Sequence, residues 1–223
     1  MSIITLTTDF GLKDPYVGEM KGVILSINKS ANIVDITHKV SPQDVMEGAL
    51  TLSQAYPFFP EDTIHVAVVD PGVGSERRPV LINTGREIFI GPDNGIFTKV
   101  LQRGKVKRII HLTNRKYFLN NISSTFHGRD VFAPVAAHLS SGVNANELGS
   151  EIDNPILLKL PFAIISGGKV TGELIYIDGY GNLISNITEE EIRSLEHEDS
   201  LIVKLNKRVI KGMKNTYSDV GAG

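Results

Sequence analysis

The stretch IHVAVVDPGVGSERR, residues 64–78, decides the fold predicted for this chain. Its first six residues form an apolar run typical of a buried strand, and Asp70 stands where that strand ends. Pro71 cannot continue a strand ladder, and Gly72 and Gly74 let the backbone fold back. Because ligands bind at strand ends in open α/β sheets, this loop is the first candidate site.

Outward from this loop, residues 1 to about 160 alternate between strand-like and helix-like segments. The pattern predicts strands at 3–7, 32–37, 64–69, 80–83, 88–90 and 108–112, with 80–83 and 88–90 paired as a hairpin around Gly85. It predicts helices at 17–27, 45–55, 96–102 and 131–139, with Gln43 or Asp44 as the cap of the second. We therefore expect an N-terminal α/β domain over residues 1–162, with a mostly parallel sheet covered by helices.

Near residue 160 the pattern changes. Residues 157–168 end in Ser166-Gly167-Gly168 and are typical of a linker and a turn. Strand signals follow at 169–178, 183–186, 200–205 and 208–210. These signals predict a small all-β domain over residues 163–223.

Composition narrows the function classes. The chain has 223 residues, 41% of them hydrophobic, and a formal net charge of -2, so its charge does not favour a nucleic-acid partner. It has no cysteine, which excludes disulfides, thiolate metal sites and a cysteine nucleophile. The N-terminus has no basic segment followed by a long apolar run, and no apolar run approaches 18 residues. We expect a cytoplasmic protein with no membrane partner.

Two candidate sites follow predicted strands of the N-terminal domain. Asp9, with Asp14 close behind, comes after the first strand, where a carboxylate can accept hydrogen bonds from a vicinal diol. A helix cap or a turn is the structural alternative for these acids. Asp70 and Arg77 are seven residues apart in the second site, and a simple ion pair on a tight turn explains them equally well. No Walker lysine is present in that loop.

Two further segments carry chemistry. Thr125-Phe126-His127-Gly128-Arg129-Asp130 comes just before a predicted helix, where His127 can serve as an acid, a base or an oriented donor. Asp178-Gly179-Tyr180-Gly181-Asn182 reads either as a hairpin turn or as an aromatic that stacks on a base. The remaining histidines have no metal-ligand spacing, so we expect no metal site.

Taken together and in order, six segments resemble one known family. They are TTDFG (7–11), SPQDV (41–45), VVDPGVGSERR (68–78), GPDNG (91–95), TFHGRD (125–130) and IDGYGN (177–182), and they span nearly the whole chain. The family is that of the S-adenosyl-L-methionine (SAM) hydroxide adenosyltransferases, also called adenosine-forming SAM hydrolases. Fluorinating and chlorinating enzymes that act on the same substrate are its relatives.

The resemblance implies hydrolysis of SAM to adenosine and methionine, with SAM as substrate and no cofactor. It implies an α/β domain, a C-terminal β-barrel-like domain, and a homotrimer whose sites lie between the N-terminal domain of one subunit and the C-terminal domain of its neighbour. By motif position the catalytic residues look like Asp70, Arg77 and His127, whereas Arg78 is assigned a structural role. The remaining substrate ligands implied are Asp9 for ribose, Asp14 and Asp178 for the methionine end, Tyr180 and Asn182 for adenine, and Phe126 and Gly128 in the pocket wall.

Two alternatives stay open beside the hydrolase. The halogenating relatives carry Tyr where Asp70 stands and Tyr-Ser where His127-Gly128 stand, so a halogenase is the weaker alternative. A binding module without turnover is the other. Family chains usually continue past residues 216–220 with a motif that helps to hold methionine and adenine, and this chain ends at Gly223. If that continuation is truly missing, we expect weaker binding or activity.

Overall fold

The computed structural model describes residues 2–195, 201–214, 216 and 219. The chain divides into two compact units, Met1–Leu158 and Lys159–Gly223. One seven-stranded sheet belongs to the first unit, and three two-stranded sheets belong to the second. Among the described residues, every helix is too short or too polar to cross a membrane.

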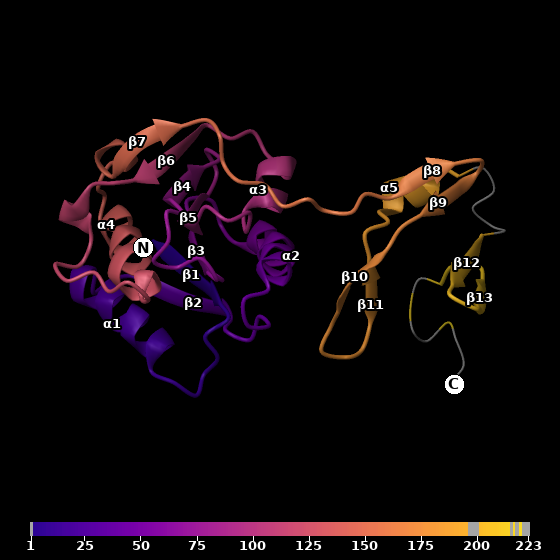
Figure 1. Cartoon of the computed structure of the whole chain (residues 1–223), viewed down its shortest axis with the longest axis horizontal. Coiled ribbons are helices and arrows are strands. Elements are labelled where there is room, and N and C mark those ends of the chain that lie inside the picture. Colours follow the sequence, from indigo (N-terminus) through magenta and orange to yellow (C-terminus); the bar gives the residue numbers. More distant parts are fainter. Residues whose placement is uncertain (1, 196–200, 215, 217–218, 220–223) are drawn as a thin grey trace. The chain divides into compact units, whose positions relative to one another are not determined.

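The strands of the first unit are β1 Ile3–Thr8, β2 Asn32–Thr37, β3 Ile64–Val68, β4 Pro79–Asn83, β5 Ile88–Pro92, β6 Arg108–Leu112 and β7 Gly149–Ile152. Their order in the sheet is β2-β1-β3-β5-β4-β6-β7 (Figure 1). The pairs β2–β1, β1–β3 and β3–β5 are parallel, whereas β4 is antiparallel to both of its neighbours and β7 is antiparallel to β6. Only β4 and β7 therefore run against the direction of the other strands of this sheet. The fold is mixed α/β, with a mostly parallel central sheet.

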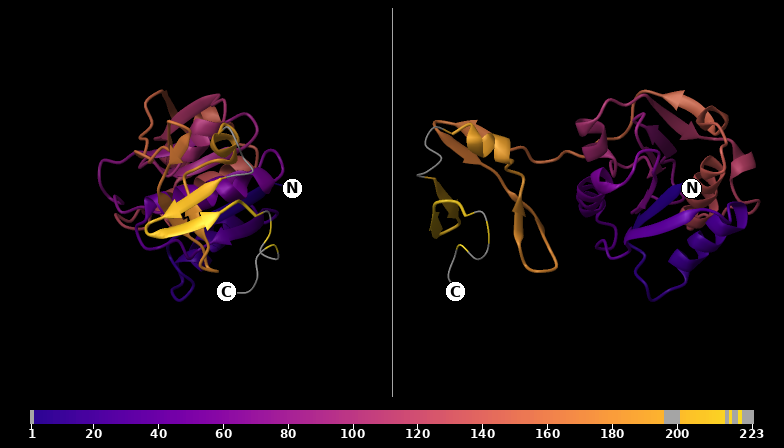
Figure 2. Two further views of the ribbon diagram at one scale, coloured as in Figure 1. Left: turned by 90° about the vertical axis from the view of Figure 1, so that its right-hand side faces the viewer. Right: turned by 180° about the vertical axis from the view of Figure 1, so that it is seen from behind.

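Helices cover both faces of this sheet (Figures 1 and 2). They are α1 Tyr16–Ile27, α2 Val45–Ala55, α3 Thr98–Arg103 and α4 Ala133–Ser140. On one face Met20 of α1 and Val135 of α4 join Leu6 of β1 in one apolar core. On the other face Leu52 of α2 and Phe89 of β5 belong to a second core. With both faces covered, β3 is buried along its whole length, which explains its unbroken apolar run.

Most predicted elements of this unit are confirmed. The hairpin 80–83 and 88–90 is the antiparallel pair β4–β5. The predicted helix 45–55 is α2, and Asp44 caps it by accepting a hydrogen bond from the N–H of Glu47 at 2.9 Å. Gln43, the other cap considered, instead adopts a left-handed backbone conformation with φ 65°. The predicted helix 96–102 begins later and is α3.

The predicted helix 131–139 was wrong at its beginning. A π-helical turn, η3 Gly128–Phe132, precedes α4, so the helical segment begins before residue 131. Pro134 lies in the first turn of α4, where a missing N–H costs no helical hydrogen bond. The strand β7 was not predicted, because its sequence GSEI has no apolar alternation and its pairing depends on β6.

The second unit consists of hairpins among its described residues. Its elements are β8 Ile164–Ser166, β9 Lys169–Thr171, β10 Leu174–Ile177, β11 Leu183–Ser185, α5 Glu189–Arg193, β12 Ile202–Leu205 and β13 Arg208–Lys211. The pairs β8–β9, β10–β11 and β12–β13 are antiparallel. The all-β prediction missed the short helix α5 and took β9 and β10 as one strand. The predicted start at Ser200 lies outside the described residues.

Candidate active site

The loop after β3 folds back by two tight turns. The N–H of Val73 donates to the Asp70 carbonyl, and the N–H of Ser75 donates to the Gly72 carbonyl. Gly74 has φ +79°, and a Cβ there would come within 2.4 Å of the Ser124 carbonyl oxygen. Only glycine fits this position without strain, and its close approach brings the loop against residues 123–127.

Asp70 and Arg77 form a buried ion pair across this loop. The Arg77 Nε–H donates to Asp70 Oδ1 at 3.0 Å, and Arg77 Nη2 lies 2.6 Å from Asp70 Oδ2. The Arg77 side chain is only 7% exposed and the Asp70 side chain only 5%. Removing either partner would leave an uncompensated buried charge, so the pair acts as one unit.

His127 joins this pair from a distant part of the chain. Its Nδ1 lies 2.6 Å from Arg77 Nη2. Burial and the positive charge of Arg77 lower the pKa of His127 below its ordinary value of 6.5, although Asp70 and Asp130 act in the opposite direction. The structure therefore brings Asp70, Arg77 and His127 together in one constellation.

One nitrogen of Arg77 has no hydrogen-bond partner. Nη1 is buried, and no acceptor contacts it among the described residues. The guanidinium carbon lies 5.4 Å from the centre of the Phe132 ring, which is itself fully buried. A buried donor without a partner is costly, so Nη1 is suited to an oxygen of a bound molecule.

Asp130, which is not among the site residues predicted from the sequence, holds the His127 segment in place. It is fully buried, and its Oδ2 accepts a hydrogen bond from the Ser123 N–H at 2.7 Å. Arg129 pairs with its Oδ1 and, through Nη1, with Glu19 on α1 at 2.9 Å. Its position two residues after Gly128, a predicted site residue, was the sequence signal that could have identified Asp130.

Asp9 lies at the end of β1, on the same edge of the parallel strands as Asp70. Its Oδ2 accepts a hydrogen bond from the Gln43 N–H at 2.8 Å. The left-handed conformation of Gln43 accompanies this bond, and strained backbone of this kind concentrates at functional sites. Asp14 is exposed and makes no hydrogen bond to the described residues.

Phe126 and Gly128, on either side of His127 in the chain, lie near the start of α1 and the residues before it. The Phe126 ring lies 5.2 Å from the Tyr16 ring. A Cβ at Gly128 would come within 3.2 Å of the Phe10 ring, so this position also tolerates little added bulk. Phe10, which follows Asp9 in the chain, therefore joins Tyr16 and Phe126 in a group of aromatic rings beside Gly128.

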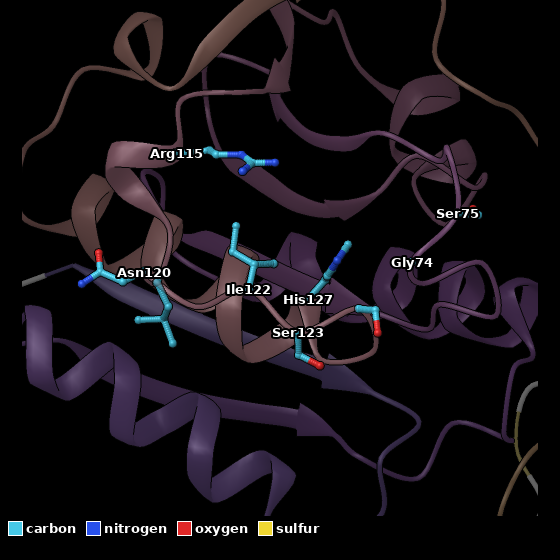
Figure 3. Close-up of a pocket in the computed structure, with 9 residues that line it drawn as sticks. Gly74, Ser75, Arg115, Asn120, Ile122, Ser123 and His127 are labelled. Atoms are coloured by element: carbon cyan, nitrogen blue, oxygen red, sulfur yellow. The ribbon is translucent and has the colours of Figure 1, made fainter.

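A pocket of about 540 Å³ borders His127 on the first unit. In Figure 3 Arg115 lies on one side of it and Gly74 and Ser75 on another, with His127 between them. Its lining residues are mostly polar or small and include no carboxylate: Gly74, Ser75, Arg115, Leu119, Asn120, Ile122, Ser123, Ser124 and His127. The pocket therefore meets the constellation at His127.

Arg78, next to Arg77 in sequence, has different partners. Its Nε donates to Asp93 Oδ2 at 2.9 Å, and its Nη2 donates to the Asn154 carbonyl at 2.6 Å. Asp93 also accepts a hydrogen bond from the Ile156 N–H at 2.8 Å. Arg78 therefore ties the segment after β7 to the sheet.

In the second unit, Asp178, Tyr180 and Asn182 share the turn between β10 and β11. Asp178 accepts hydrogen bonds from the backbone N–H groups of Tyr180 and Asn182 and from the Asn182 side chain. These bonds, led by that of the Asn182 side chain, lower the pKa of Asp178. The Tyr180 side chain is 96% exposed. The prediction of a hairpin turn at residues 178–182 is therefore correct, and the exposed Tyr180 lies at the tip of this turn.

No group of three or more metal-ligating side chains occurs within the described residues.

Comparison with known proteins decides the family. Residues 4–149 match the model of the SAM hydroxide adenosyltransferase N-terminal domain, and residues 172–223 match that of the C-terminal domain. The chain belongs to the SAM hydroxide adenosyltransferase family. The resemblance inferred from the six sequence motifs is thereby confirmed.

Three curated relatives are similar to this chain over most of its length. An (R)-S-adenosyl-L-methionine hydrolase of Methanocaldococcus jannaschii is 40% identical over 213 residues, which are 93% of this chain and 75% of that protein. One of the same name from Salinispora tropica is 36% identical over 99% of this chain and 83% of its own length. A fluorinase of an Actinoplanes species is 29% identical over 85% of this chain and 73% of its own length.

A solved structure is similar to the whole fold. The crystal structure of an uncharacterized conserved protein from Thermotoga maritima is 37% identical, with a TM-score of 0.91. The similarity covers 100% of this chain and 86% of that one. The similarity to this solved structure therefore includes residues of both units.

Proposed function

We propose that this chain hydrolyses SAM to adenosine and L-methionine. The observation that carries the proposal is the constellation of a half-buried His127 and the buried pair Asp70–Arg77, in which Arg77 Nη1 has no partner among the described residues. Relatives named (R)-S-adenosyl-L-methionine hydrolase at 36% to 40% identity support the same substrate.

The reaction has a simple physical account. The oxygen of a water molecule forms a bond to the ribose C5′ as the C5′–S bond breaks, and the electron pair of that bond stays on sulfur. Methionine leaves as a neutral thioether, so its departure needs no general acid. The attacking water loses one proton, and the positive charge of Arg77 stabilises the hydroxide character that develops. Holding water and C5′ in line contributes roughly 7–11 kcal/mol to lowering the barrier.

The substrate contacts are assigned residue by residue. Asp9 takes the ribose diol, since one of its oxygens is held by Gln43 and the other is available. Phe126 and Gly128 form the wall next to it. Asp14 and Asp178 take the ammonium end of methionine, and Tyr180 and Asn182 contact adenine. No cofactor or metal enters the reaction.

The proposal includes the architecture of the site. An α/β domain over residues 1–162 and a β-barrel-like domain over 163–223 contribute to it, and the site lies between the first domain of one subunit and the second domain of its neighbour in a homotrimer. Many apolar side chains of the second unit are exposed in the single chain, Ile165, Leu174 and Ile210 among them, which supports a partner surface. The protein acts in the cytoplasm, without a nucleic-acid or membrane partner.

Incubation of the purified chain with SAM in H₂¹⁸O tests the proposal. Adenosine and methionine are expected in equal amounts, with ¹⁸O in the 5′ hydroxyl of adenosine. A parallel reaction with fluoride and chloride is expected to give no 5′-halo-5′-deoxyadenosine. Binding of SAM in calorimetry without any adenosine over prolonged incubation would refute the hydrolase and leave a binding module.

A further inference from the structure

The hydrogen bond between Arg77 and His127 fixes where the imidazole carries its proton. A guanidinium has five N–H donors, no acceptor and a charge that it keeps at any physiological pH. Because Arg77 Nη2 lies 2.6 Å from His127 Nδ1, Nδ1 must be the acceptor. A neutral imidazole whose Nδ1 accepts has its only proton on Nε2.

The surroundings of the ring favour this neutral form. The charged groups that face His127 are Arg77 and Asp70 from the loop after β3, Asp130 from η3, and Arg115 across the pocket. Burial and Arg77 outweigh the two carboxylates in their effect on the imidazole. An imidazolium would also point an N–H at the guanidinium and lose the hydrogen bond to Arg77.

The contacts of Arg77 show which of its nitrogens have partners. Nε–H and Nη2 face the two oxygens of Asp70, and Nη2 also donates to His127 Nδ1. The two N–H groups of Nη1 are left without a partner among the described residues. Asp70 and His127 therefore hold the guanidinium through Nε and Nη2, and Nη1 is the nitrogen without a hydrogen-bond partner among the described residues.

We propose that His127 is a positioning residue that holds Arg77 as the neutral Nε2–H tautomer, and that it does not receive the proton of the attacking water. This role in turnover rests on the proposed hydrolysis, whereas the tautomer does not. Arg77, aimed by His127 and Asp70, presents Nη1 to the developing hydroxide. The proton of the water then passes to solvent water, because the lone pair of His127 Nδ1 is held by Arg77 and both oxygens of Asp70 lie on the opposite side of the guanidinium.

Nitrogen NMR of the full chain tests the tautomer directly. Protein labelled with ¹⁵N at histidine is measured through two-bond couplings at pH 7.5, with His127→Asn identifying the His127 signals. A signal of an unprotonated Nδ1 and a protonated Nε2 is expected. An Nδ1–H tautomer or an imidazolium would overturn the proposal, whether or not the chain hydrolyses SAM.

Conservative substitution tests the role in turnover. Asparagine places its Oδ1 near the position of Nδ1, so His127→Asn keeps an acceptor for Arg77 but has no group that can act as a base. We expect His127→Ala to slow kcat by about 100-fold or more and His127→Asn to stay within about 10-fold of the original chain. His138→Asn, on α4, is the matched control for a histidine outside the constellation.

The outcomes separate the two proposals. Equal loss of kcat in His127→Asn and His127→Ala, with unchanged folding by circular dichroism, would show that the ring itself accepts the proton. Absence of adenosine from the original chain would refute the hydrolase, and the NMR result on the tautomer would still stand.

Discussion

Arg77 binds Asp70 side-on, through Nε at 3.0 Å from Oδ1 and Nη2 at 2.6 Å from Oδ2, with both side chains buried. The geometry leaves Nη1 on the far side of the guanidinium, where it has no partner among the described residues. The Asp70–Arg77 ion pair therefore contributes both to the stability of this loop and to the chemistry that we propose for it.

Replacing Asp70 with Asn is expected to affect both turnover and stability. The amide keeps the shape of the carboxylate but leaves the buried Arg77 without a counter-charge. We expect kcat to fall by about 10²–10³-fold, and the free energy of unfolding to fall by about 3–5 kcal/mol. Adenosine release and urea unfolding measure the two effects. Asp153→Asn, at an exposed position, is the control and should change neither.

The two neighbouring arginines should respond differently to lysine. Arg77→Lys cannot reproduce the side-on pairing with Asp70 together with the bond to His127, so kcat should fall by roughly 100-fold or more. Arg78→Lys loses the bonds to Asp93 and Asn154, so it should lower the melting temperature while kcat at 25 °C stays within a few-fold. A larger loss of kcat in Arg78→Lys than in Arg77→Lys would contradict this division.

Activity should depend on pH through His127. Its folded-state pKa lies below the ordinary 6.5, so the neutral ring persists at pH 6.5 and above. As the pH falls through that lowered pKa, the protonated ring repels Arg77 and kcat/KM should decline. The profile should therefore be flat from pH 7 to 8 and fall only on the acid side. An acid limb centred above pH 6.5 would argue against this assignment.

Stability should depend on pH through His65, a residue of β3 that does not contact Asp70, Arg77 or His127. It is fully buried, its Nδ1 lies 2.8 Å from Thr5 Oγ1, and burial lowers its pKa from 6.5 to about 4. Because the unfolded chain binds this proton more readily, stability falls as the pH decreases from 6.5 toward 4. We expect a loss of about 2 kcal/mol between pH 8 and pH 5. Urea unfolding of the original chain and of His65→Phe should show a smaller pH dependence in the variant, and equal dependence would contradict the prediction.

Local patterns were sufficient for much of the fold. The unbroken apolar run at 64–69 predicted a strand buried on both faces, and β3 is such a strand. The helix 45–55 and its cap Asp44 followed from helical periodicity and capping preference. Elements without such a pattern were missed: β7 has no apolar alternation, and the π-helical turn η3 depends on how its segment packs.

Part of the candidate site could likewise be predicted from local sequence features, and part could not. Asp70 at the end of a core strand, and the spacing from Asp70 to Arg77, are visible in the sequence, because strand ends and turn residues are local features. The partner of Asp130 is not visible in the sequence, because Ser123 donates to Asp130 through its backbone N–H and no side-chain pattern marks such a bond.

The sequence by itself determined that acids follow β1 and β3, that glycines shape the loop after β3, and that six ordered motifs resemble one family. Only the tertiary structure decided that His127 meets Arg77, fifty positions away, and through which nitrogen. The physical reason is that periodicity and turn chemistry act over a few residues, whereas this contact depends on Gly74 packing against the Ser124 carbonyl. Because Arg77 Nη2 faces Nδ1 of that ring, Nδ1 is the acceptor and the proton of the neutral ring lies on Nε2.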